Sequence, residues 1–309
     1  MDSINKIINF VFPPLALYGL FVFYPIYQRL KYIISIYQNL FSENVAGKVV
    51  VITGAASGIG EALAYEYGKK GAYLALVDIR EEPLFHVAAL AELYGSPEFM
   101  PIIADVSKPQ DCERFIRDMF LHFGRLDHLV TNAGVAPLYL FEDIDDLSKA
   151  SPAMDINFWG SVYCTFLEKT RGRIVVIASG CGYISSPRLS FYCASKAAVI
   201  AFYESIRTEF GSEIGVTIVA PGVIDTEMTR GKFMTKNGEL VVDKELRDVQ
   251  INVLPVESAE RCAKAIMRSV CRGDRYLLEP EWIGSVILWK VFCSEVTDSL
   301  GRWLLAGSG

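Results

Sequence analysis

The sequence predicts an α/β protein built on a doubly wound parallel sheet of about seven strands. The first observation behind this prediction is an alternation of short β-branched runs with longer amphipathic stretches from Lys48 onward. Such alternation is typical of parallel strands joined by helices that cover both faces of a sheet. The second is a glycine-rich turn directly after the first run. No repeat or low-complexity linker interrupts the pattern, so we predict one domain over residues 42–309.

The candidate strands are short apolar runs rich in valine, isoleucine and leucine. They are 48–53, 73–78, 99–105, 126–132, 173–179, 215–221 and 275–279. Helices are expected between them, for example over 59–70, 108–123 and 191–210.

The N-terminal region predicts a hydrophobic anchor over residues 1–41. Residues 7–27 contain no charged side chain, and as a helix at about 1.5 Å per residue they would cover roughly the 30 Å of a bilayer's hydrocarbon. Pro13, Pro14 and Pro25 disfavour a straight helix, because proline lacks an amide donor and clashes with the preceding turn. A kinked or hairpin insertion therefore competes with a simple span. A cleaved signal peptide is a weaker alternative, since no small-residue cleavage pattern follows.

Charge and composition place the large domain in the cytosol. Arg29, Lys31 and Lys48 follow the apolar segment whereas only Lys6 precedes it, and cytoplasmic flanks are the more basic ones. No Asn-X-Ser/Thr acceptor occurs, and the seven cysteines lack metal-ligand spacing, so we predict reduced thiols and no metal site. The net charge of −6, without a basic block, argues against nucleic acid as a partner.

The glycine-rich turn, "TGAASGIG", predicts a dinucleotide site of the Rossmann type. Gly54 would allow the tight turn, Gly58 would let the backbone approach a pyrophosphate, and Gly60 would permit close helix packing. The N-terminus of the following helix favours the anion. Ser57 and Ile59 belong to the same turn and are candidates for cofactor contact.

The end of the second strand bears on the choice of cofactor. Asp78 lies 24 residues after Gly54, where a carboxylate can accept hydrogen bonds from the ribose hydroxyls of NAD and would repel a 2′-phosphate. Arg80 is the counter-argument, because a nearby arginine can hold that phosphate. We therefore predict NAD, with NADP as the alternative.

Tyr192 and Lys196 are candidates for proton transfer. Four residues apart on an expected helix, they would share one face. An unperturbed tyrosine has a pKa of about 10 and is a poor base at neutral pH. A cation one turn away favours the phenolate, which would lower that pKa and let Tyr192 exchange a proton with a hydroxyl or carbonyl. The alternative is a simple helix-surface pair.

Three motifs in order resemble the short-chain dehydrogenase/reductase family over roughly residues 45–280. They are the Gly-X-X-X-Gly-X-Gly turn, "NAG" at 132–134 and "YCASK" at 192–196. The resemblance implies an NAD(P)-dependent oxidoreductase that interconverts a secondary alcohol and a ketone. Its catalytic set would be Asn157, Ser179, Tyr192 and Lys196. In this set Ser179 would bind the substrate oxygen, Lys196 the nicotinamide ribose, and Asn157 a water.

The same resemblance implies further cofactor contacts. Among these residues, Asn132 would mainly stabilise the sheet, and Asp105 has an alternative interpretation as a turn residue. These contacts would come from Asp105, Val106, Asn132, Ala133, Gly134, Tyr192, Lys196, Pro221, Gly222 and Thr226.

One departure from the family pattern precedes the fifth strand. Asn157 and Ser179 are 22 positions apart, about five fewer than the family usually shows, which would shorten a helix by more than one turn. If the loop from Arg171 to Arg173 cannot absorb the loss, the strand could slip, Ser179 could move, or a homodimer surface could fail. A lipid-droplet coat or tethering protein with a weakly active or inactive dehydrogenase fold is therefore the alternative function.

Two segments bear on the substrate and the location. Residues 228–252 form a charged lid, and 281–305 are apolar enough for a substrate wall, a membrane-dipping helix or core. With its proline-bearing anchor the chain resembles plant 11β-hydroxysteroid dehydrogenase-like proteins, the steroleosins, although Arg29 stands where a third knob proline is expected after Pro13 and Pro25. That implies a steroid-like or other lipophilic substrate, and a lipid-droplet monolayer or ER membrane as the location.

Overall fold

The computed structural model describes residues 2–40, 42–167, 172–251 and 255–306. The chain divides into two compact units, residues 1–43 and residues 44–309. Each unit is described by itself.

The first unit is the long helix α1 (Asp2–Leu40). Its apolar side chains are exposed, with Phe10 and Phe21 at 83% and 81%. The helix bends by 41° between residues 6–12 and 17–38, and Pro13 and Pro14 fall in the break, as expected of a helix that loses an amide donor. Within the described residues no single helix is long and apolar enough to cross a membrane, while this bent pair could by length and composition.

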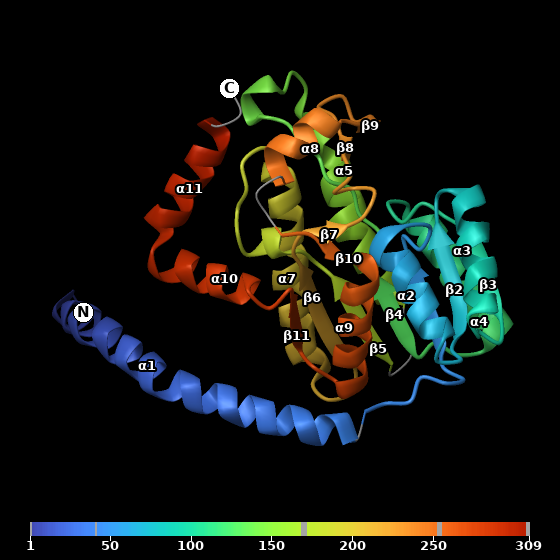
Figure 1. Cartoon of the computed structure of the whole chain (residues 1–309), viewed down its shortest axis with the longest axis horizontal. Helices are drawn as coiled ribbons and strands as arrows, with labels where there is room; N and C mark the ends of the chain where they lie inside the picture. Colours follow the sequence, from blue (N-terminus) through green and yellow to red (C-terminus); the bar gives the residue numbers. More distant parts are fainter. Residues whose placement is uncertain (1, 41, 168–171, 252–254, 307–309) are drawn as a thin grey trace. The chain divides into compact units, whose positions relative to one another are not determined.

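The second unit contains seven parallel strands in the order β11-β6-β5-β4-β1-β2-β3 (Figure 1). Their bounds are β1 (Val49–Thr53), β2 (Tyr73–Asp78), β3 (Phe99–Ile103), β4 (His128–Thr131), β5 (Arg173–Ile177), β6 (Gly215–Pro221) and β11 (Tyr276–Glu279). The predicted doubly wound sheet is confirmed. Order reverses beside β1, because β2 and β4 pair with its opposite edges. A ligand binds such sheets at this reversal, beyond the carboxyl ends of the strands.

Helices cover both faces of the sheet. One face packs against α2 (Gly58–Gly68), α3 (Glu81–Leu93) and α9 (Ala259–Arg272). The other packs against α4 (Pro109–Phe123), α6 (Gly160–Leu167) and α7 (Ser190–Phe210). Val50 and Ile52 of β1 face the first set, whereas Val49 and Val51 face the second. Successive strand residues point to opposite faces, so a strand buried on both sides is apolar throughout.

The shortened connection before β5 does not displace that strand. Arg173 pairs with His128 of β4 on one side and with Gly215 of β6 on the other, so the register slip considered above is absent. Residues 168–171, including Arg171, lie outside the described residues. Helix α6 is held by α7, because the Tyr203 hydroxyl lies 2.7 Å from Ser161 Oγ.

The remaining elements lie outside the seven-stranded sheet. They are η1 (Phe141–Asp143), η2 (Leu147–Ala150), α5 (Ser151–Met154), η3 (Asp155–Trp159), η4 (Gly180–Gly182), β7 (Ile224–Asp225), β8 (Lys232–Met234), β9 (Leu240–Val242), α8 (Lys244–Ile251), β10 (Glu257–Ser258), α10 (Ile283–Phe292) and α11 (Ser294–Ala306).

The segment predicted as a charged lid is an antiparallel hairpin, β8 with β9, followed by α8. Met234 of this hairpin also bridges to Pro137, after β4. In the apolar C-terminal segment Ile283 is buried, whereas Trp289 is 59% exposed. The described part of residues 281–305 is therefore only partly buried, and the segment is not all core.

Candidate active site

A single cavity of about 440 Å³ collects nearly all the predicted site residues. It lies beyond the carboxyl ends of the strands. Of the predicted set, those that line it are Gly54, Ser57, Gly58, Ile59, Asp78, Asp105, Val106, Asn132, Ala133, Gly134, Ser179, Tyr192, Lys196, Pro221, Gly222 and Thr226. Gly60 and Asn157 are the two that do not line it.

The glycine turn has the backbone geometry that glycine permits. Gly54 has φ +64°, and a Cβ there would lie 2.7 Å from the Cα of Ala133. Gly60 acts behind the cavity wall, since its Cβ would lie 2.2 Å from the carbonyl oxygen of Gly54. The Asn132 side chain donates to the carbonyls of Thr53 and Gly54, both at 3.0 Å. Asn132 therefore holds the glycine turn against β4, a structural role.

Asp78, the last residue of β2, is buried and bonded on both carboxylate oxygens. Its Oδ2 accepts from the backbone amide of Ala56 at 3.0 Å. Its Oδ1 accepts from the backbone amide of Arg80 at 3.0 Å and from Arg80 Nε at 3.1 Å. The carboxylate thus faces the cavity from a fixed position and already carries an arginine partner.

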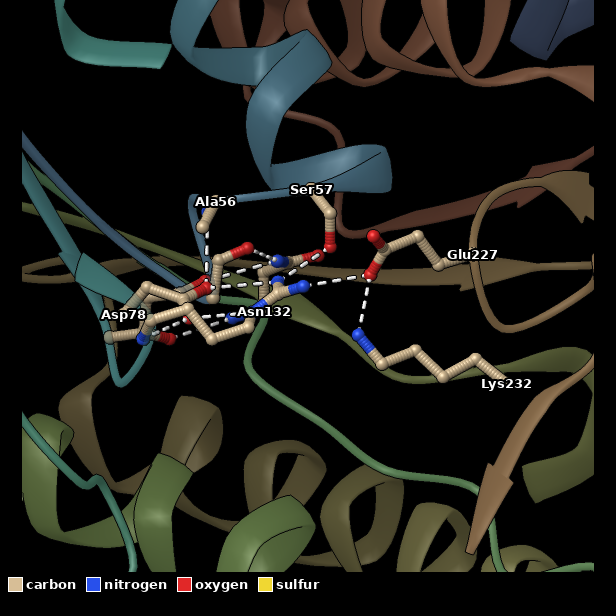
Figure 2. Close-up of polar contacts among 9 residues, drawn as sticks. Ala56, Ser57, Asp78, Asn132, Glu227 and Lys232 are labelled. Atoms are coloured by element: carbon tan, nitrogen blue, oxygen red, sulfur yellow. Dashed lines mark hydrogen bonds and ion pairs between the residues drawn. The ribbon is translucent and has the colours of Figure 1, made fainter. Parts of the chain in front are cut away.

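Arg80 connects Asp78 with a distant segment of the chain. Figure 2 shows Asp78 and Ser57 with Glu227 and Lys232 of that segment. Its guanidinium donates to Ser57 Oγ at 2.8 Å and to Glu227 Oε2 at 2.7 Å. Lys232 donates to the same Glu227 oxygen at 2.9 Å. A polar network therefore links the end of β2 and the glycine turn with the segment that follows β7.

Asp105 serves as a turn residue through its side chain. Its Oδ1 accepts from the backbone amide and the hydroxyl of Ser107, at 3.0 and 2.7 Å. The sequence left two interpretations of Asp105 open, an adenine contact of the cofactor or a turn residue, and the structure shows the turn directly. Val106, which follows it, is buried against Gly160.

Asn157 is saturated by protein groups. It lies in η3, a π-helical turn, and its Oδ1 accepts from the Val135 amide at 2.8 Å. Its Nδ2 donates to the Val135 carbonyl at 3.0 Å and to Ser195 Oγ at 2.9 Å. Because Asn157 is buried and outside the cavity lining, its side chain joins the segment after β4 to α7, and the expected contact with a water stays a prediction.

Ser179, Tyr192 and Lys196 meet in the cavity. The buried Ser179 follows β5, and its Oγ accepts from the Cys181 amide at 3.1 Å. The Tyr192 phenol lies close enough to Ser179 for that side chain to influence its pKa. Lys196 Nζ donates to the Ile177 carbonyl at 2.9 Å and lies 5.9 Å from the centroid of the Tyr192 ring. Both side chains come from the first turns of α7 and line the cavity. The interpretation as a helix-surface pair is therefore excluded.

The electrostatics of this group differ from the expectation. Desolvation by burial raises the pKa of Tyr192 above its ordinary value, and the Ser179 side chain only opposes this. Burial also lowers the pKa of Lys196 to about 8. The predicted lowering of the Tyr192 pKa by Lys196 is therefore wrong for the free chain, because enclosure disfavours both charged forms.

The sequence matches the model of the family described as short chain dehydrogenase over residues 48–237. The chain belongs to this short-chain dehydrogenase family. It is therefore an oxidoreductase.

Relatives place this short-chain dehydrogenase in the plant hydroxysteroid dehydrogenase-like group. It is 83% identical over 310 residues to 11-beta-hydroxysteroid dehydrogenase-like 6 of Arabidopsis thaliana, covering 99% of this chain and 91% of that protein. It is 50% identical over 309 residues to 11-beta-hydroxysteroid dehydrogenase A of Arachis hypogaea, covering 98% and 88%.

A solved structure shares the fold of this short-chain dehydrogenase. A short chain dehydrogenase/reductase from Burkholderia phymatum, in complex with NAD, is similar with a TM-score of 0.71 at 21% identity, covering 82% of this chain and 96% of that chain.

Sequence reasoning missed three residues around this site. Glu227 and Lys232 line the cavity and bind each other, yet neither was singled out as a site residue. Ser195, between Tyr192 and Lys196, anchors Asn157. Glu227 and Ser195 had a sequence signal, because Glu227 directly follows the expected cofactor contact Thr226 and Ser195 lies inside the "YCASK" motif, whereas Lys232 had none.

Proposed function

We propose that this short-chain dehydrogenase interconverts a secondary alcohol and a ketone on a steroid-like or other lipophilic substrate, with NAD as cofactor and NADP as the alternative. The observation that carries the proposal is one cavity lined by both the glycine turn with Asp78 and the Ser179, Tyr192 and Lys196 group. The names of the relatives and the NAD bound by the similar structure support it.

The cavity fits a dinucleotide at its glycine end. Gly54 and Gly58 have φ of +64° and +62°, which keeps side chains away from a pyrophosphate at the N-terminus of α2. Asp78 would bind the adenosine ribose, and Lys196 the nicotinamide ribose. The bound cofactor supplies the hydride chemistry.

The protein groups would manage the proton. With its raised pKa, Tyr192 is protonated at neutral pH, so its hydroxyl can donate to a carbonyl oxygen while Ser179 hydrogen-bonds the same oxygen. In the reverse direction Tyr192 would take the proton of an alcohol. A protonated Lys196 would then favour the phenolate.

The far end of the cavity favours an apolar substrate. Met228, Met234 and Leu240 line it. Met228 and Tyr192 also pack against a small cluster of buried apolar residues that includes Phe233. Apolar walls with a few convergent polar groups are typical of sites for lipophilic molecules.

Titration with NAD⁺ and NADP⁺, followed by turnover of a panel of steroid alcohols, tests the proposal. Tyr192→Phe should keep nucleotide binding and lose turnover, whereas the remote Tyr94→Phe should keep both. Turnover that survives in Tyr192→Phe would refute the assignment of the proton donor. Nucleotide binding without turnover of any alcohol would favour the coat or tethering function.

We propose further that residues 1–41 attach the protein to a lipid-droplet monolayer or the ER membrane, with the catalytic domain in the cytosol. The support is the exposed apolar surface of α1 and the bend at its prolines. The same surface favours the alternative function, a lipid-droplet coat or tether of low activity. A hairpin would suit a monolayer, which has no second aqueous side, whereas α1 is a single helix that bends by 41°.

We also propose that the protein forms a homodimer. Phe166 and Trp159, at 84% and 44% exposure, leave an apolar surface beside the shortened connection. Sedimentation of the wild type against Phe166→Lys tests it, since a dimer built there should dissociate in the variant. Equal sedimentation of both would rule this surface out.

A further inference from the structure

Arg80 connects two segments that are 147 residues apart in the sequence. It begins beside Asp78 at the end of β2 and reaches Glu227, which lies between β7 and β8 (Figure 2). Both Arg80 and Glu227 line the cavity. Their ion pair of 2.7 Å therefore lies at the end of the cavity where Asp78 is expected to meet an adenosine ribose.

Each guanidinium nitrogen of Arg80 contacts a protein acceptor. Its Nε and backbone amide bind Asp78, one terminal nitrogen binds Ser57, and the other binds Glu227. Hydrogen bonds from Lys232 and Arg80 hold the pKa of Glu227 below its ordinary value, although burial opposes them. Glu227 is thus a carboxylate that shares one oxygen between two cations.

The charges of this group balance. Asp78 and Glu227 contribute two negative charges, and Arg80 and Lys232 contribute two positive ones. A 2′-phosphate entering here would meet no net attraction, and it would have to displace a carboxylate to reach the arginine. Without Glu227 the group would carry a net charge of +1, and one terminal nitrogen of Arg80 would be available to a phosphate.

We propose that Glu227 is a specificity-determining residue for the cofactor, acting by holding the Arg80 guanidinium away from the 2′-phosphate that distinguishes NADP from NAD. The inference rests on the proposed function, because it assumes that a nicotinamide dinucleotide binds this cavity. Glu227 belongs to the segment expected to contact the substrate. The inference gives this residue a role at the adenosine end of the cofactor, opposite the nicotinamide. The carboxylate of Asp78 then repels the 2′-phosphate. Glu227 excludes the same phosphate by binding the Arg80 guanidinium, which would otherwise bind the phosphate.

Asp225 offers a matched control in the same segment. It is two residues from Glu227 and carries the same charge, but its carboxylate is bound by Arg230, at 2.7 and 2.9 Å. It does not line the cavity. Asp225→Asn therefore removes the same charge from the same segment while leaving the Arg80 contact in place.

The test measures dissociation constants of NAD⁺ and NADP⁺ for the full chain in detergent, by intrinsic fluorescence. Glu227→Gln should tighten NADP⁺ relative to NAD⁺ by about tenfold, the effect of one charge-assisted hydrogen bond. Asp225→Asn should change the ratio by less than about twofold, the effect of a screened surface charge. In an Arg80→Gln background, Glu227→Gln should leave the ratio unchanged, because its effect acts through Arg80.

An unchanged ratio in Glu227→Gln would overturn the inference, and so would an equal shift in Asp225→Asn or a shift that persists without Arg80. Each of these results leaves the proposed function intact, because the wild type still binds nucleotide. Failure of the wild type to bind either nucleotide would overturn the proposed function and the inference together.

Discussion

The ammonium nitrogen of Lys196 lies 5.9 Å from the centroid of the Tyr192 ring, one turn further along α7. It donates to the Ile177 carbonyl at 2.9 Å and is therefore tied to the end of β5. Lys196 is 4% exposed, so its charge has little access to water. Burial deprives the Lys196 ammonium of solvation and so disfavours its charged form. The stability of the protein should therefore depend on pH where this lysine titrates.

The first prediction concerns stability against pH. Burial lowers the pKa of Lys196 to about 8, whereas an unfolded lysine has a pKa of about 10.4. Between these values the unfolded chain binds more protons, so the free energy of unfolding should rise with pH from about 8 to 10. Relative to Lys196→Met, the wild type should gain up to about 1.4 kcal/mol per pH unit in urea titrations.

The comparison with Lys196→Met removes the titrations that both proteins share. Tyr192 interferes little below about pH 10, because its raised pKa lowers stability only once an unfolded tyrosine, with a pKa of about 10, begins to lose its proton. Parallel curves for the two proteins between pH 8 and 10 would show that Lys196 is not desolvated as described.

The second prediction concerns Asn157. Asn157→Leu keeps the volume but leaves the Val135 amide and carbonyl and the Ser195 hydroxyl without this partner. Buried polar groups left unpaired cost about 1–3 kcal/mol each, so we expect a loss of roughly 2–4 kcal/mol in the free energy of unfolding. Gln110→Leu, on the exposed surface of α4, should change it by less than about 0.5 kcal/mol. Equal effects would contradict a positioning role for Asn157.

The third prediction concerns the turn after β1. Gly60→Ala brings a Cβ within 2.2 Å of the Gly54 carbonyl oxygen, and backbone cannot give way there without moving the turn. Nucleotide affinity should fall at least about tenfold, as for other sites misplaced by an ångström. Gly284→Ala is the control, because its Cβ would meet only the end of Leu278, at 3.3 Å. Unaltered affinity in Gly60→Ala would show that the turn is not the cofactor site.

The fourth prediction concerns the anchor. A fluorescent fusion of residues 1–41 should collect on lipid droplets, and a fusion of 42–309 should remain diffuse. Replacing Pro13, Pro14 and Pro25 with leucine restores the missing amide donors and should straighten the helix. The signal should then move from droplets to the ER, because a straight apolar helix spans a bilayer. Diffuse signal from the 1–41 fusion would refute the anchor.

Much of the fold follows from local pattern. The bounds of β2 and β6 match the predicted runs, because a strand buried on both faces must be apolar throughout. Tyr192 and Lys196 lie together because helical spacing alone puts them on one face. These features depend on residues that are close together in the sequence, so they can be predicted from the sequence alone.

The remaining features depend on contacts between distant segments. The pair of Arg80 and Glu227 forms only when the fold brings the end of β2 and the segment after β7 together. The pKa of Tyr192 was predicted in the wrong direction because desolvation is set by the surrounding fold. The shortened connection before β5 was judged from length alone, whereas Tyr203 of α7 binds Ser161 and Thr165 of α6 there.

The single cavity that reaches from Asp78 past Tyr192 to Leu240 has a consequence for the order of events in turnover. A dinucleotide bound as proposed, from Asp78 to Lys196, would share this one space with the second reactant, which would be left the part lined by Met228, Met234 and Leu240. We therefore expect binding in a compulsory order, in which the nucleotide is first to arrive and last to depart.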